Sequence, residues 1–431
     1  MVCARDGRVS RAARAIALLK SPAVVYLGAA LLSRVGGFLL VPLYTRRLTL
    51  EEYGEYALFL TLLTFLSTFL SLGLVGAITK FYFSSADRDD GRARAAEVAR
   101  WVIAVCLTSG TILAITVWTL APDAGVALWS RSTLLLAIVG GLGVAIGPIP
   151  SVLLRAEQRP YAAASFQLVQ FATTIGAGLL FVLVLDRGYR GAIEAAAAGQ
   201  AIAGLLAIAY VTALPRGAMS AATLRRALRF AVPFVPHFIA AWLQGAADRW
   251  IMNGAGYEAE LGEYSLATQV ASPVSMLVLA YNDSVGPTLG EHYRRGGLPE
   301  VRANLRGVRL RFLAAVLGVG GVLVLALPAI ALLVGEDFRS GLLLVPFVLL
   351  TLVPDPALYS ADYHVVYYAG RTRVLGGATV IAALVNVALN LLLIPATGAW
   401  GAIAARFCAG ATRAGIVHWA ARTVRESEAS R

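Results

Sequence analysis

Residues 54–64 read GEYALFLTLLT and begin one of the apolar runs that decide the fold of this chain. From Tyr56 to Thr79 no residue carries a charge. A helix needs about 20 predominantly apolar residues to cross the hydrocarbon core of a bilayer. This stretch therefore predicts a transmembrane helix that enters the membrane directly after Glu55.

Further runs of the same kind explain the composition of the chain. Of its 431 residues, 58% are hydrophobic and 14% are charged, whereas soluble domains contain roughly 45–50% apolar and about 25% charged residues. The predicted spans are 22–43, 56–79, 101–120, 133–154, 162–185, 192–214, 230–247, 264–289, 312–334, 342–368, 374–397 and 399–421. We therefore expect an all-α, polytopic membrane protein with about twelve transmembrane helices.

The basic residues are distributed unequally between the predicted loops. A net charge of +12 would suggest nucleic-acid binding in a soluble protein. Twelve spans place both termini on one side, and that side holds 27 of the 37 Lys and Arg residues, against seven on the other. This bias follows the positive-inside rule. It predicts cytoplasmic termini, attraction to anionic membrane lipid and no nucleic-acid partner.

The opening stretch has a second copy further along the chain. Residues 262–272 read GEYSLATQVAS, identical to residues 54–64 at four of eleven positions, and each copy opens the second helix of a six-helix half. Chance recurrence of Gly-Glu-Tyr is the alternative explanation. Because six spans preserve orientation, the pattern predicts two six-helix bundles related as a parallel repeat, residues 1–214 and 215–431.

Polar and charged residues inside the spans form the candidate functional site. A charge in hydrocarbon is costly, and such residues commonly face a bundle interior or a water-filled cavity. The candidates for cavity acids or coupling groups are His237, Asp248, Asp283, Asp355 and Asp362. The candidates for substrate binding are Arg34, Gln244, Arg249, Gln269, Arg406 and Arg413. Several arginines in one cavity favour an anion, because the guanidinium group binds phosphate through a planar fork of donors.

These candidates also have structural explanations. Asp248 and Arg249 close an apolar run near the predicted outer surface, where an ion pair would suffice. His237 could be a hydrogen-bonded packing residue. Asp355 and Asp362 are separated by about 10 Å of helix, so they are either independent cavity acids or partners of arginines on other helices.

Two longer segments resemble a known family. Residues 26–74 (YLGAALLSRVGGFLLVPLYTRRLTLEEYGEYALFLTLLTFLSTFLSLGL) are similar to the opening of the oligosaccharide flippase family, the Wzx-type polysaccharide exporters. Residues 247–267 (ADRWIMNGAGYEAELGEYSLA) are similar to the opening of that family's second half. This family is part of the multidrug/oligosaccharidyl-lipid/polysaccharide exporter superfamily.

The resemblance implies a location, a substrate and partners. It implies two bundles around a central cationic cavity in the bacterial cytoplasmic membrane. It also implies an undecaprenyl-pyrophosphate-linked oligosaccharide as substrate and polysaccharide assembly proteins as partners. Lipopolysaccharide is one surface polymer that such a carrier would serve.

Three classes of function compete for this sequence. The favoured one is a flippase that moves a lipid-linked oligosaccharide by alternating access. The alternative is a cation-coupled multidrug antiporter of the MATE-like kind, which Asp355 and Asp362 favour and the arginines disfavour. A membrane enzyme would need a sizeable catalytic loop, and no such loop is predicted, so we expect no enzymatic activity. The three cysteines lack metal-binding spacing, and neither a metal nor a cofactor is expected.

Overall fold

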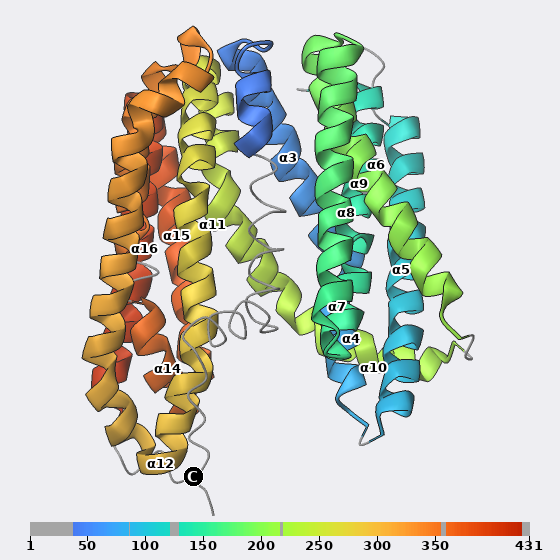
Figure 1. Ribbon diagram of the computed structural model, residues 1–431, viewed down its shortest axis with the longest axis vertical. Helices are drawn as coiled ribbons and strands as arrows, with labels where there is room; N and C mark the ends of the chain where they lie inside the picture. The colour runs from blue at the N-terminus through green and yellow to red at the C-terminus, as the bar shows by residue number, and fades with distance from the viewer. Residues whose placement is uncertain (1–37, 86, 121–128, 216–218, 355–358, 425–431) are drawn as a thin grey trace, which may run out of the picture.

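The computed structural model describes residues 38–85, 87–120, 129–215, 219–354 and 359–424, without the side chains of residues 279–284, 287, 360 and 361. Regular secondary structure in these ranges is helical throughout, and the helices form two bundles that stand side by side (Figure 1). The first bundle contains α3 (Leu50–Ser71), α4 (Val75–Tyr82), α5 (Arg88–Leu120), α6 (Arg131–Ile146), α7 (Ile149–Ala156), α8 (Pro160–Gly178), its π-helical continuation η1 (Leu179–Val184) and α9 (Gly188–Ala213).

The second bundle is reached through α10 (Ala221–Ala231) and the short 3₁₀ helix η2 (Val232–Phe234). It contains α11 (Val235–Gly254), α12 (Glu258–Leu333), η3 (Glu336–Phe338), η4 (Ser340–Leu344), α13 (Val345–Leu350), α14 (Ser360–Tyr368), α15 (Thr372–Thr397) and α16 (Ala399–Thr423).

Eight helical segments of the described chain are long and apolar enough to cross a membrane. They coincide with predicted spans two to seven, nine and eleven. Large apolar side chains cover the outside, as Leu325 (82% exposed) and Leu392 (71% exposed) illustrate. The predicted all-α, polytopic membrane fold is confirmed. The count of twelve spans stays a prediction, because span one falls largely outside the described residues.

Helix α3 begins where it does because of a capping box. The Thr49 hydroxyl accepts a hydrogen bond from the backbone N–H of Glu52 at 3.2 Å, and the Glu52 carboxylate accepts one from the backbone N–H of Thr49 at 2.9 Å. Such a cap contributes about 1 kcal/mol to helix stability. It fixes the start of α3 one turn before Gly54, so the Gly-Glu-Tyr motif lies in the first turns of the helix.

Helix α12 contains two spans joined by a tight turn. Its only non-helical residues are Gly296 and Gly297, and Gly297 adopts φ +65° and ψ −154°. A side chain would disfavour this backbone conformation, so glycine is needed here. The two arms of α12 therefore run antiparallel with no intervening loop, as Figure 1 shows.

The buried side chains show where the bundles meet. One large apolar core is shared by both bundles and includes Leu58 and Phe59 of α3 together with Tyr264 and Leu266 of α12. Two further cores each lie within one bundle, near the α4–α5 connection and near the α12 turn. We call the end where α3 begins the closed end, and the end that holds α10 and the α12 turn the basic end.

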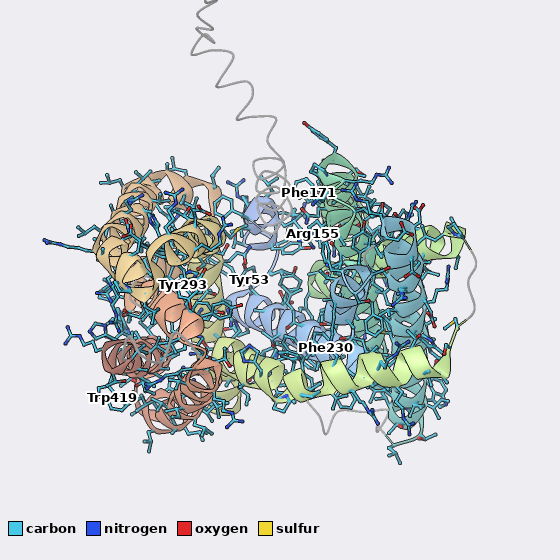
Figure 2. All side chains as sticks on the ribbon, turned by 90° about the horizontal axis from the view of Figure 1, so that it is seen from below. Tyr53, Arg155, Phe171, Phe230, Tyr293 and Trp419 are labelled. Carbon is cyan, nitrogen blue, oxygen red and sulfur yellow. The ribbon has the colours of Figure 1, made fainter. Side chains whose placement is uncertain are left out.

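The link between the bundles is helical. Helix α10 packs against α4 and α5 of the first bundle, whereas α11 packs against α15 of the second. Viewed from below, α10 and α11 run as one element along the flank of the molecule (Figure 2). Helix α10 thus packs on the first bundle, although it lies beyond the predicted domain boundary at residue 214.

Candidate functional site

At the closed end, α3 crosses α12 at the two glycines of the repeated motif. A Cβ atom on Gly54 would lie 2.9 Å from the carbonyl oxygen of Glu258 and 3.2 Å from the backbone nitrogen of Gly262. A Cβ atom on Gly262 would overlap the carbonyl oxygen of Leu50. Small residues allow membrane helices to approach this closely. The two copies of the motif therefore pack against each other.

Further contacts join the bundles at this end. The backbone N–H of Gly335 donates to the hydroxyl of Thr45 at 3.1 Å. The ring of Tyr53 meets the ring of Phe338 edge-on, with centroids 5.3 Å apart. At the closed end the two bundles are thus held together by the close approach of the α3 and α12 backbones, by a hydrogen bond and by aromatic packing.

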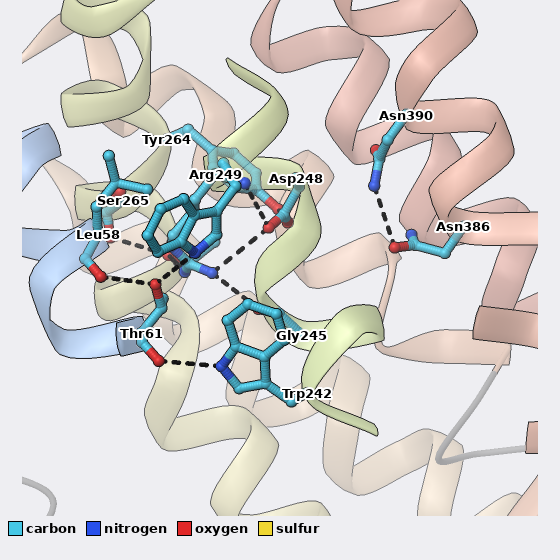
Figure 3. A network of polar contacts seen from close by, with 12 residues as sticks. Leu58, Thr61, Trp242, Gly245, Asp248, Arg249, Tyr264, Ser265, Asn386 and Asn390 are labelled. Atoms are coloured by element: carbon cyan, nitrogen blue, oxygen red, sulfur yellow. Dashed lines mark hydrogen bonds and ion pairs between the residues drawn. The ribbon is translucent and has the colours of Figure 1, made fainter. Parts of the chain in front are cut away.

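Two residues beyond Gly262, Tyr264 leads into a buried polar network centred on Asp248 (Figure 3). The Asp248 residue is only 2% exposed. Tyr264 donates its hydroxyl proton to Oδ2 at 2.5 Å, and the backbone N–H of Arg249 donates to Oδ1 at 2.8 Å. Both carboxylate oxygens are therefore hydrogen-bonded, as a buried charge requires.

The side chain of Arg249 is fixed from both sides. Nη1 donates to the carbonyl oxygen of Gly245 at 2.9 Å, and Nη2 donates to the hydroxyl of Thr268 at 2.9 Å. Nη1 also lies 3.6 Å from Oδ1 of Asp248, and the arginine side chain is 14% exposed. The structure thus places the predicted Asp248–Arg249 pair in the interior of the molecule.

Arg406 of α16 belongs to the same network. It interacts with Tyr264 and, through space, with Asp248. Together with Gln244 it lines a cavity of about 160 Å³, which is completed by Ala241, Gly245, Thr351, Leu352 and Gly410. Two guanidinium groups therefore interact with one carboxylate, which leaves an excess positive charge beside the cavity.

Two tryptophans of α11 tie this network to the first bundle. The indole Nε1–H of Trp242 donates to the carbonyl oxygen of Thr61 at 3.0 Å, and that of Trp250 donates to the Thr61 hydroxyl at 3.0 Å. Sequence reasoning did not single out either tryptophan. Their indole N–H groups could have marked them, because a buried indole N–H usually donates a hydrogen bond to an acceptor on a neighbouring element. The polar network thus lies at the junction of the two bundles.

A second buried acid, Asp362 of α14, has its own basic partners. Its Oδ1 pairs with Arg309 of α12, and its Oδ2 lies 2.8 Å from Nδ1 of His418 on α16. This is one of the two arrangements left open from the sequence, an acid paired with an arginine on another helix. Neither partner was among the candidates from the sequence, because Arg309 falls between predicted spans eight and nine and His418 falls in predicted span twelve.

The remaining predicted residues lie apart or outside the described part of the chain. Arg413 lies over the ring of Tyr359 at 4.6 Å, Gln269 is partly buried in α12, and His237 is exposed at the start of α11. Arg34, Asp355 and the side chain of Asp283 lie outside the described residues. In the part of the chain that is described, no group of three or more His, Cys, Asp or Glu side chains could hold a metal ion.

Comparison with known sequences identifies related proteins. A family model described as polysaccharide biosynthesis protein matches residues 19–292. The chain is also similar to protein 1 of the Lsg locus of Haemophilus influenzae, with 22% identity over 375 residues, which covers 85% of this chain and 88% of that protein.

Solved structures show the same fold. An inward-facing multidrug resistance MATE family transporter of the MOP superfamily aligns with a TM-score of 0.66 at 16% identity, covering 93% of this chain and 97% of that one. The lipid II flippase MurJ, in an inward closed conformation, aligns with a TM-score of 0.68 at 13% identity, covering 94% and 89%. A MOP superfamily transporter from Pyrococcus furiosus aligns with a TM-score of 0.58 at 16% identity, covering 95% and 96%.

Proposed function

This chain belongs to the polysaccharide biosynthesis protein family, and we propose that it is a flippase for a lipid-linked oligosaccharide. The substrate we infer is an undecaprenyl-pyrophosphate-linked oligosaccharide, carried across the bacterial cytoplasmic membrane for surface polysaccharide biosynthesis. The reaction requires binding and release of an amphipathic anion and needs no covalent step.

One observation carries the proposal above all. Arg249 and Arg406 both interact with the single carboxylate of Asp248, and Arg406 lines a cavity at the junction of the bundles. A buried excess of positive charge is costly in a membrane. A pyrophosphate would balance it, and the planar guanidinium group of Arg406 suits a phosphate oxygen pair.

The arrangement of the bundles supports alternating access. They share one core at the closed end and have separate cores toward the basic end. We infer that the basic end faces the cytoplasm, in keeping with the positive-inside rule. The structure would then correspond to the state that receives substrate from the cytoplasmic leaflet, with the outer exit shut.

This orientation predicts a labelling pattern. Cysteines at Asp89 and Ala303, both exposed at the basic end, should resist an impermeant thiol reagent in intact cells and react after permeabilisation. Cysteines at Ser132 and Asp337, exposed toward the closed end, should react in intact cells. The background should lack Cys3 and the exposed Cys408. The reverse pattern would invert the proposed orientation.

Loss of the gene tests the function, and Arg406 tests the site. A deletion strain should accumulate lipid-linked oligosaccharide on the cytoplasmic leaflet and lose its surface polymer. Wild-type protein should restore the polymer.

Variants of Arg406 test the site in the same strain. Arg406→Lys should restore the polymer in part, because lysine keeps the charge but loses the planar fork of donors. Arg406→Ala should restore little. Polymer and membrane protein level are measured together, so that lost activity is distinguished from lost protein.

A second candidate function has one observation in its favour. Asp248 is a buried acid that accepts a hydrogen bond from Tyr264 next to a cavity, which would also suit a cation-coupled antiporter. In that case the deletion strain would keep its surface polymer and change only in its sensitivity to cationic drugs.

A further inference from the structure

A second and larger cavity lies at the basic end of the first bundle, away from the Asp248 network. Its volume is about 810 Å³. It is lined by α4, α5, α10 and η2 through Lys80, Phe81, Ser84, Arg94, Glu97, Thr223, Arg226, Arg229, Phe230 and Phe234. None of these residues belongs to the Asp248 network, so the proposed transport site does not explain the cavity.

Three cationic side chains of the cavity have no acidic partner among the described residues and can therefore bind an anion. Arg94 is paired with Asp90 at 2.9 Å, and the carboxylate of Glu97 accepts a hydrogen bond from the backbone N–H of Ser220 at 2.8 Å. Lys80, Arg226 and Arg229 are exposed, and none of them forms an ion pair within the described residues. The cavity wall is therefore cationic.

The same cavity has an aromatic wall. Lys80 places its Nζ 4.0 Å from the ring centroid of Phe230, and Phe234 is 46% exposed. Exposed apolar side chains continue from it along η2 and the first turn of α11, namely Val232 (46%) and Phe238 (39%). Figure 2 shows Phe230 on the helical element that crosses between the bundles. Cations thus border an apolar strip that forms the first turns of predicted span seven.

We propose that this cavity binds an anionic phospholipid of the membrane leaflet at the basic end. The lipid phosphate lies among Lys80, Arg226 and Arg229, and an acyl chain follows Phe230 and Phe234. Free phosphate would use the cations but would leave the aromatic wall unoccupied. A diacyl lipid matches both parts, since juxtamembrane Lys and Arg attract anionic headgroups.

The location gives the lipid an effect on the protein. Its proposed site bridges α4 and α5 of the first bundle to α10 and η2, the helical segment through which the chain passes to the second bundle. A lipid bound there would hold the start of the link against the first bundle. We therefore expect anionic lipid to raise the thermal stability of the protein as well as to bind it.

Native mass spectrometry and thermal unfolding of the purified full-length protein test the proposal. The probes are phosphatidylglycerol, zwitterionic phosphatidylcholine and inorganic phosphate. Phosphatidylglycerol should bind and stabilise, and the other two should not. In the variant Lys80→Gln/Arg226→Gln/Arg229→Gln, its affinity should fall about a hundredfold, given the contribution of each basic residue near an anionic surface.

A matched control separates a defined site from general surface charge. Arg306, Arg311 and Arg373 are exposed at the basic end of the second bundle, and their triple Gln variant loses the same charge. It should keep wild-type affinity for phosphatidylglycerol. Phe234→Ala should weaken lipid binding without changing the charge. Equal loss in both triple variants, equal binding of phosphatidylcholine, or equal stabilisation by inorganic phosphate would each overturn the proposal.

Discussion

Replacing Gly262 by leucine is expected to prevent the closed end from forming and, through loss of the proposed transport, to abolish the surface polymer. Even a single Cβ atom at this position would overlap the carbonyl oxygen of Leu50 in α3. Overpacking of a close contact costs roughly 1–3 kcal/mol, which shifts a conformational equilibrium by about fivefold to 150-fold. Because the contact involves backbone on both sides, no side chain can rotate away to relieve it.

Spin labels at Glu51 and Asp337, which are exposed on the two sides of the closed end, would measure the opening directly. The distance between them should lengthen in Gly262→Leu. Gly318→Leu on the same helix is the control, since a Cβ atom at Gly318 would meet nothing within 4 Å. If Gly262→Leu kept the wild-type distance and exported polymer normally, the glycine contact would have no part in transport.

Removal of Asp248 is the second substitution with a large expected effect. Asp248→Ala would leave the partly buried Arg249 and Arg406 without their carboxylate and Tyr264 without its acceptor. Breaking a buried ion pair from one side costs about 3–5 kcal/mol, so both the protein level in the membrane and transport should fall sharply. Asp248→Asn keeps the size and the acceptor for Tyr264, and should be less harmful.

A double variant shows whether the loss of stability on removing Asp248 comes from the unbalanced charge of the two arginines. Asp248→Asn with Arg249→Gln should regain protein level relative to Asp248→Asn alone, because one buried cation is removed with the acid. Asp337→Ala, the loss of an exposed acid, should have no effect on protein level. A normal level of Asp248→Ala protein would show that the carboxylate is not needed to balance the two arginines. Level is measured by immunoblot of purified membranes, and transport by surface polymer.

The sequence predicted the fold class because a bilayer imposes a strict requirement on it. Every span must be apolar and long enough, so the spans are readable without tertiary information. The break in α12 was harder to place. The sequence marks Gly296 and Gly297 as adjacent glycines, yet helical structure continues on both sides of them, and that continuity depends on packing.

The candidate site was predicted in part. Local pattern identified Asp248 and Arg249, which are neighbours in the chain. The roles of Tyr264 and Arg406 depend on contacts between α11, α12 and α16, which no local pattern encodes. His237 is a candidate on the same predicted span as Asp248, yet it is exposed whereas Asp248 is buried. The burial of each residue depends on which helices pack against its part of α11, and a local pattern does not encode that packing.

The glycine contact also has a symmetry. Gly54 meets the backbone of Glu258, and Gly262 meets the backbone of Leu50. Leu50 and Glu258 hold the same place in the two copies, one helical turn before each glycine. The contact is therefore reciprocal, like the isologous interface of a two-fold symmetric dimer. At this contact the chain therefore packs like two subunits of a symmetric dimer carried on one polypeptide, and α10 lies in the segment that connects them.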